Sequence, residues 1–65
     1  MKENARIREE MKKYGVPQWM VAVQLHISES TLIRWLRMPL SKDREENIQQ
    51  AIVAAAQAKE ADHHA

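Results

Sequence analysis

Residues 18–37 read QWMVAVQLHISESTLIRWLR, and the fold of the chain follows from this segment. Apolar residues recur in it with helical spacing on both sides of His26. Ser28 stands just before the second set, and serine is a good N-cap because its hydroxyl accepts a hydrogen bond from the unpaired N–H groups that open a helix. We therefore expect two short helices joined by a tight turn, the second over residues 28–37.

The side chains around this turn fit two helices that cross at a steep angle. Ala22 is small enough for the point where the helices come closest. Ile27 and Leu32, before and after the cap, can contact each other as a hydrophobic staple. Large apolar side chains should fill the pocket between the helices. The residues expected to point inward are Val21, Leu25, Ile27, Leu32, Trp35 and Leu36.

The opposite face of the second helix is polar and carries two arginines, Arg34 and Arg37. Two short helices with this pattern are typical of a helix-turn-helix, whose second helix lies in the major groove of DNA. The segment therefore favours DNA binding. The face that would enter the groove consists of Glu29, Ser30, Ile33, Arg34 and Arg37.

A further helix is expected before this unit. Residues 3–14 carry one apolar stripe with helical spacing, and Gly15 follows where a helix end needs a residue that tolerates positive φ. Pro17 suits the first turn of the next helix, because its missing N–H would be unpaired there anyway. The apolar stripe consists of Ile7, Met11 and Tyr14.

A last helix is expected after the unit. Pro39 ends the helix over residues 28–37, and Ser41 is the next N-cap candidate. The alanine-rich end of the chain has high helix propensity but little to bury, so we expect a disordered tail over residues 61–65. The apolar face of this helix is expected at Ile48, Ile52, Ala55 and Ala56.

The composition supports an all-α fold. The chain has 65 residues with one glycine and two prolines, so few residues interrupt helices. A chain of this length forms one domain at most, and we expect a small four-helix bundle over residues 1–60. Cysteine is absent from the sequence, which excludes disulfides and thiolate metal sites.

The charge is distributed unevenly, although the formal net charge is only +1. Residues 1–42 hold eight basic and four acidic side chains, whereas residues 43–65 hold two basic and five acidic ones. A basic first part and an acidic last part suit a protein that faces phosphates on one side only. Ordinary surface charge is the alternative explanation, since many neutral domains show such an asymmetry.

Residues 18–37 resemble the helix-turn-helix of the Cro and lambda-repressor family of small phage and mobile-element regulators. The matching positions are Gln18, Val21, Ala22, Leu25, Ile27, Ser28, Leu32 and Trp35. Short regulators of Gram-positive mobile elements are similar too, with Thr where Pro17 stands and Gly where His26 stands. The turn residue of the family often adopts a left-handed conformation, which glycine tolerates best. The resemblance implies an all-helical, lambda-repressor-like bundle.

The resemblance also implies how bases would be read. Arg34 would make a bidentate contact to guanine O6 and N7, and Glu29 would accept from a cytosine amino group or orient an arginine. Ile33 would meet a thymine methyl group. Ser28 and Ser30 would lie at the leading end of the recognition helix.

Other residues would position the protein on the duplex. Gln18 would contact a phosphate from the start of its helix, and Arg37 and Lys42 would contact phosphates near the end of the recognition helix. One such unit reads only half a site, so a homodimer on a two-fold operator is expected. The expected dimer contact lies at Ile48, Ile52, Ala55 and Ala56.

We therefore expect a cytoplasmic, sequence-specific binder of double-stranded DNA, a small transcriptional regulator of a phage, plasmid or integrative element. One alternative is an accessory, excisionase-like factor for recombination or conjugation. A second alternative is a protein-interaction module on the same scaffold, with Trp19, Ile33 and Trp35 on the partner surface.

Other classes of function find no support in the residues. The chain has no cysteine nucleophile, no Gly-rich phosphate loop and no convergent carboxylate pair, so we do not expect an enzyme or a cofactor. His63 and His64 are adjacent and His26 is far away in sequence, so we expect no metal site. No small-molecule ligand is expected, because a chain this small has little room for an effector pocket. No membrane contact is expected, because no apolar run is long enough to span a bilayer.

Overall fold

The computed structural model of the chain describes residues 4–64, with side chains described for residues 4–60. The described residues form four helices and no strand, which confirms the expected all-α fold. The side chains of the expected tail over residues 61–65 all lie outside the described ones, and the helical backbone is described to His64. The four helices are α1 (Ala5–Tyr14), α2 (Gln18–Leu25), α3 (Glu29–Leu36) and α4 (Lys42–His64).

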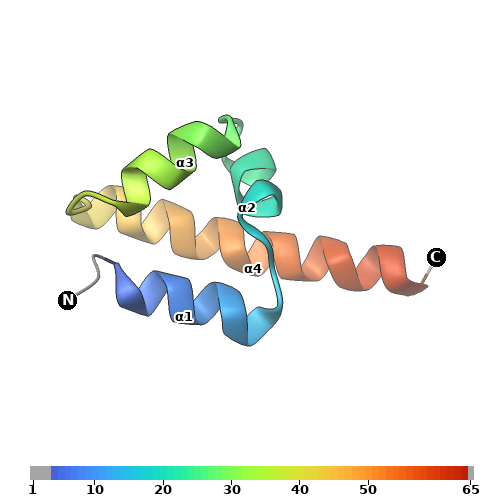
Figure 1. Cartoon of the computed structure of the whole chain (residues 1–65). Coiled ribbons are helices and arrows are strands. Elements are labelled where there is room, and N and C mark those ends of the chain that lie inside the picture. Colours follow the sequence, from blue (N-terminus) through green and yellow to red (C-terminus); the bar gives the residue numbers. More distant parts are fainter. Residues whose placement is uncertain (1–3, 65) are drawn as a thin grey trace.

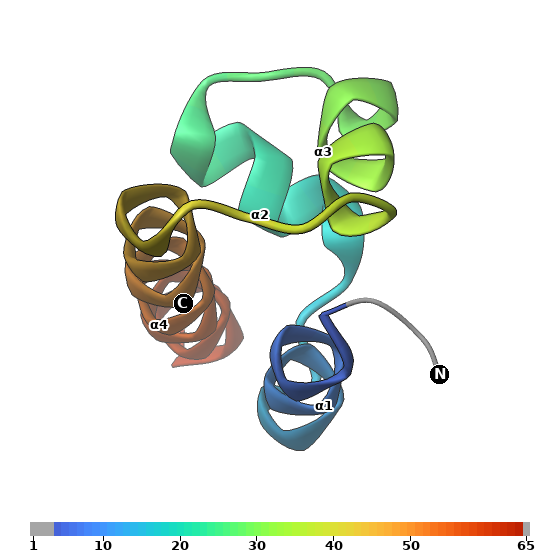
Figure 2. The same cartoon turned by 90° about the vertical axis from the view of Figure 1, so that its left-hand side faces the viewer.

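Helix α4 runs the length of the molecule; α1 and α2 pack directly against it, and α3 packs against α2 (Figure 1). Helix α1 lies beside α4 and runs in the same direction, while α2 and α3 cover another side (Figures 1 and 2). The ammonium group of Lys59 on α4 donates a hydrogen bond of 2.6 Å to the carbonyl of Gly15. This bond joins the end of α1 to the last third of α4.

The helix boundaries follow the capping residues. The Ser28 hydroxyl accepts a hydrogen bond from the Thr31 N–H, and the Ser41 hydroxyl accepts one from the Arg44 N–H, both at 3.2 Å. Both serines are therefore N-caps, as expected. Helix α2 begins at Gln18, one residue later than expected. Pro17 has an extended backbone (φ −74°, ψ 159°), which makes it the N-cap of α2 and not its first helical residue.

Helix α1 begins later than the sequence indicated. It starts at Ala5, because Asn4 has a left-handed backbone (φ 59°, ψ 35°) that ends the helical geometry there. The expected start at Glu3 lies outside the described residues. Tyr14, expected on the buried stripe of this helix, is 44% exposed, because it lies at the end of α1 beside the surface.

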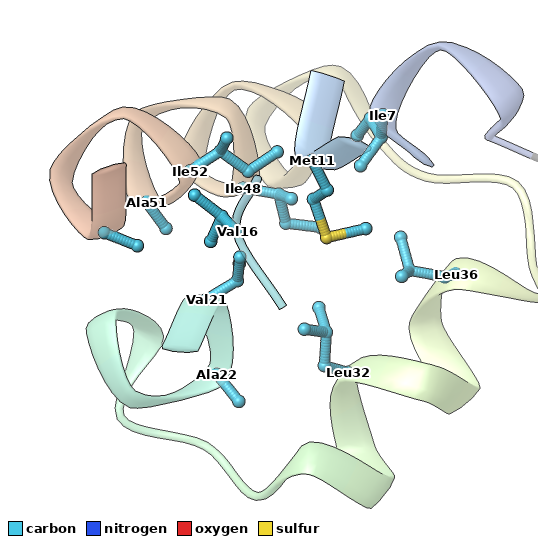
Figure 3. Packing of buried hydrophobic residues seen from close by; sticks show 11 residues of the cluster. Ile7, Met11, Val16, Val21, Ala22, Leu32, Leu36, Ile48, Ala51 and Ile52 are labelled. Atoms are coloured by element: carbon cyan, nitrogen blue, oxygen red, sulfur yellow. The ribbon is translucent and has the colours of Figure 1, made fainter. Parts of the chain in front are cut away.

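One hydrophobic core holds the four helices together (Figure 3). Leu32 and Leu36 of α3 lie in this core, and Ala22 is buried on α2, as expected. Leu25, Ile27 and Trp35 are partly buried against it. The buried cluster consists of Ile7, Met11, Val16, Val21, Ala22, Leu32, Leu36, Ile48, Ala51, Ile52 and Ala55.

The core also corrects the expected dimer contact. Ile48, Ile52 and Ala55 are each 0% exposed, because α1, α2 and α3 cover the apolar face of α4 within a single chain. These three side chains are therefore unavailable to a second copy. Ala56 is half-buried at the edge of the same cluster. The apolar face of α4 was predicted correctly, but it packs into the core of its own chain and does not face a second copy.

Candidate functional site

The turn between α2 and α3 sets how the two helices meet. His26 has a left-handed backbone (φ 60°, ψ 39°), the conformation expected of the turn residue. Its N–H donates to the carbonyl of Val23, and the N–H of Ile27 donates to the carbonyl of Ala22, both at 3.1 Å. This pair of bonds is a Schellman motif, which satisfies the last carbonyls of α2 and turns the chain sharply.

Helix α3 leaves this turn with one buried face and one exposed face. Leu32 and Leu36 point into the core, and Trp35 is half-buried beside them. The residues of the opposite side are mostly polar, and they face solvent. Ser28, Glu29, Ser30, Arg34 and Arg37 are exposed, and Ile33 is half-buried.

The structure brings six of the eight expected DNA-contacting residues together on α3 and its two caps. The other two belong to different elements. Gln18 is the first residue of α2 and is half-buried, while Lys42 is the first residue of α4 and is exposed. The exposed face of α3 holds two guanidinium groups and one carboxylate, so its net charge is positive.

The carboxyl end of α3 is bonded to α1, which the sequence did not indicate. The side-chain amide of Asn4 donates to the carbonyls of Leu36 and Met38, at 3.1 and 2.8 Å. The guanidinium of Arg8 donates to the Leu36 carbonyl as well, at 3.2 Å. These partners lie 28 to 34 residues apart in the sequence, so no local pattern predicts them.

A second contact joins α3 to α4. The guanidinium carbon of Arg44 lies 4.0 Å from the centroid of the Trp35 ring, which is a close cation–π contact. Trp35 was expected in the pocket between α2 and α3. It packs against the core and also lies beneath Arg44, so it contributes to the junction of α3 with α4.

Two apolar side chains of α2 face solvent. Trp19 is 55% exposed and Val23 is 60% exposed, and they lie one helical turn apart on the same side. Ile33 and Trp35, the other residues of a possible protein-contact surface, are half-buried. An open groove lies between the last turn of α1 and α4, and none of the residues that line it belongs to α2 or α3.

The described part of the chain holds no metal-binding cluster and no membrane-spanning helix. Its histidine, aspartate and glutamate side chains form no group of three that could hold a metal ion. None of its helices is long and apolar enough to cross a bilayer. No family model, curated protein or solved structure matches the chain.

Proposed function

We propose that this protein binds double-stranded DNA with sequence specificity through the exposed face of α3, as a small transcriptional regulator of a phage, plasmid or integrative element. The observation that carries the proposal is the combination of that basic face with the sharp left-handed turn at His26 before it. Such a turn makes α2 and α3 cross steeply, so that the face of α3 projects from the body of the protein.

In this proposal the position of a residue along α3 determines whether it contacts a base or a phosphate. Glu29, Ser30 and Ile33 contact base edges near its start, and Arg34 bonds a guanine with two N–H groups. Arg37 lies at the far end of the helix, where it contacts a phosphate. All of these residues except the half-buried Ile33 are exposed, which supports their availability to DNA.

The residues outside α3 supply phosphate contacts. Gln18 begins α2, where unpaired N–H groups favour an anion, and Lys42 is exposed at the start of α4. A homodimer would place two copies of α3 on half-sites about one helical turn of DNA apart. Because Ile48, Ile52 and Ala55 are buried, the contact between copies would use another surface.

Selection from a random duplex library, followed by anisotropy titration of the selected duplex at several salt concentrations, tests the proposal. We expect tight binding that weakens steeply with salt, because bound arginines and lysines release counterions from the phosphates. Arg34→Ala should cost about 1–3 kcal/mol and relax selection at one base position. Arg37→Ala should weaken binding to every duplex about equally.

Lys13→Ala is the matched control, because it removes the same charge from an exposed residue beside the groove of α1 and α4. It should leave both affinity and selectivity nearly unchanged. If no duplex enriches and none binds at low salt, the proposal is wrong, and a protein partner for this scaffold becomes the better explanation. Mapping the bound sites in a genome separates a promoter operator from an attachment or transfer site.

A further inference from the structure

Two side chains of α1 bind the carboxyl end of α3. The Leu36 carbonyl accepts from Asn4 at 3.1 Å and from Arg8 at 3.2 Å, and the Met38 carbonyl accepts from Asn4 at 2.8 Å. The last carbonyls of a helix have no partner within the helix. Here the partners come from an element that lies more than two dozen residues earlier in the chain.

Asn4 takes on this role in an uncommon way. It is the N-cap of α1, yet its side chain makes no hydrogen bond to its own helix. N-cap residues usually have an extended backbone and bond their own helix. Asn4 instead has a left-handed backbone, which asparagine adopts more readily than most residues. With this backbone, the side-chain amide of Asn4 donates two hydrogen bonds to the end of α3 and none to α1.

Arg8 adds a charge to the same place. The carboxyl end of a helix carries partial negative charge, so a guanidinium beside it is favourable. Arg8 lies one turn after Asn4 on α1, on the same side of the helix, since residues four apart share a face. The two side chains therefore hold the carboxyl end of α3 from one edge of α1.

We infer that Asn4 and Arg8 are positioning residues that align the exposed face of α3 for DNA, which rests on the proposed function. The core side of α3 is held by Leu32 and Leu36, whose apolar contacts are non-directional. The bonds to the Leu36 carbonyl are directional, and Leu36 lies between Arg34 and Arg37. A binding constellation must be held to within about half an ångström, so this end of the helix needs such bonds.

Asn4→Gly is the sharpest variant, because glycine keeps the left-handed backbone and removes both donors. Affinity is measured for the selected duplex and for a scrambled duplex of the same length, at a temperature where circular dichroism shows the variant folded. We expect affinity for the selected duplex to fall about threefold to tenfold, which is less than the loss of both hydrogen bonds would give if all of it reached the DNA contact. Affinity for the scrambled duplex should change by less than about twofold, because phosphate contacts need less exact alignment.

Arg8→Met and Arg8→Lys form a second pair that is independent of Asn4. Methionine keeps the apolar stem and loses the donor, whereas lysine keeps a cation that can reach the Leu36 carbonyl. Arg8→Met should lower the affinity for the selected duplex, and Arg8→Lys should restore most of it. If lysine and methionine behave alike, the bond from Arg8 does not position α3.

A measurement without DNA separates this inference from the proposed function. Residual dipolar couplings of backbone N–H groups give the orientation of α3 relative to α4 in the free protein. Asn4→Gly should change the couplings of α3 while those of α4 stay the same. If they stay the same in α3 too, and selectivity is kept, the positioning role is wrong. If wild-type protein binds no duplex but the couplings change, the proposed function fails and the positioning of α3 stands.

Discussion

Two residues end helices with the same backbone geometry but different side chains. Gly15 and His26 both have left-handed φ angles near 60°, and each is followed by a residue whose N–H reaches back to close a Schellman motif. Glycine takes this conformation without cost, whereas a residue with a Cβ is strained by roughly 1–2 kcal/mol. The turn before α3 therefore stores strain that the turn after α1 does not.

Substitution of His26 should reveal that strain. His26→Gly is expected to raise the melting temperature by a few degrees, since the relief of about 1–2 kcal/mol is only partly offset by the larger chain entropy of glycine. His26→Val is expected to lower it, because a β-branched residue is a poor fit at positive φ. Thermal unfolding by circular dichroism gives the order Gly above His above Val. A valine variant as stable as wild type would contradict the assigned turn.

At the scale of helices, the sequence predicted what neighbouring residues determine. The caps at Ser28 and Ser41, the stop at Gly15 and the inward faces of α3 and α4 all follow from short-range spacing. The bonds from α1 to the end of α3 do not, because they join distant parts of the chain. The spacing of apolar residues also could not show that the apolar face of α4 is buried within the same chain.

The cap of α3 can be tested by itself. Ser28→Ala removes the acceptor for the Thr31 N–H and the 2.9 Å contact between the two hydroxyl groups. Loss of an N-cap costs about 1 kcal/mol, which corresponds to roughly 4–8 °C in melting temperature for a domain of this size. Ser30→Ala is the control, because Ser30 is exposed inside the same helix and makes no cap. Equal losses in the two variants would show that the cap does not stabilise α3.

At the scale of the whole molecule, the four helices share one small hydrophobic core. A chain of 65 residues has a total stability of only about 3–10 kcal/mol by the usual value per residue. Ile48 and Ile52 lie fully buried in α4, where the other three helices meet it. The loss of one such side chain therefore removes a large part of the total.

Ile52→Ala is expected to destabilise the protein by about 2–5 kcal/mol, because it removes buried methyl groups and leaves a cavity. Much of the variant should then be unfolded at moderate temperature, as urea titration followed by circular dichroism would show. The next residue provides the control, since Val53 is 43% exposed and Val53→Ala should change the unfolding free energy by much less. A midpoint shared by the two variants would mean that α4 packs through a different face.

The surroundings of the two tryptophans make them separate optical reporters. Trp19 is 55% exposed on α2, so its emission should be that of a hydrated indole and open to soluble quenchers. Trp35 is half-buried beneath the Arg44 guanidinium, so its emission should be shifted to shorter wavelength and protected. With Trp19 replaced by phenylalanine, the fluorescence of Trp35 alone reports on the junction of α3 with α4, without any attached dye. A change at this junction when a partner binds α3 would therefore be visible in the intrinsic fluorescence of the protein.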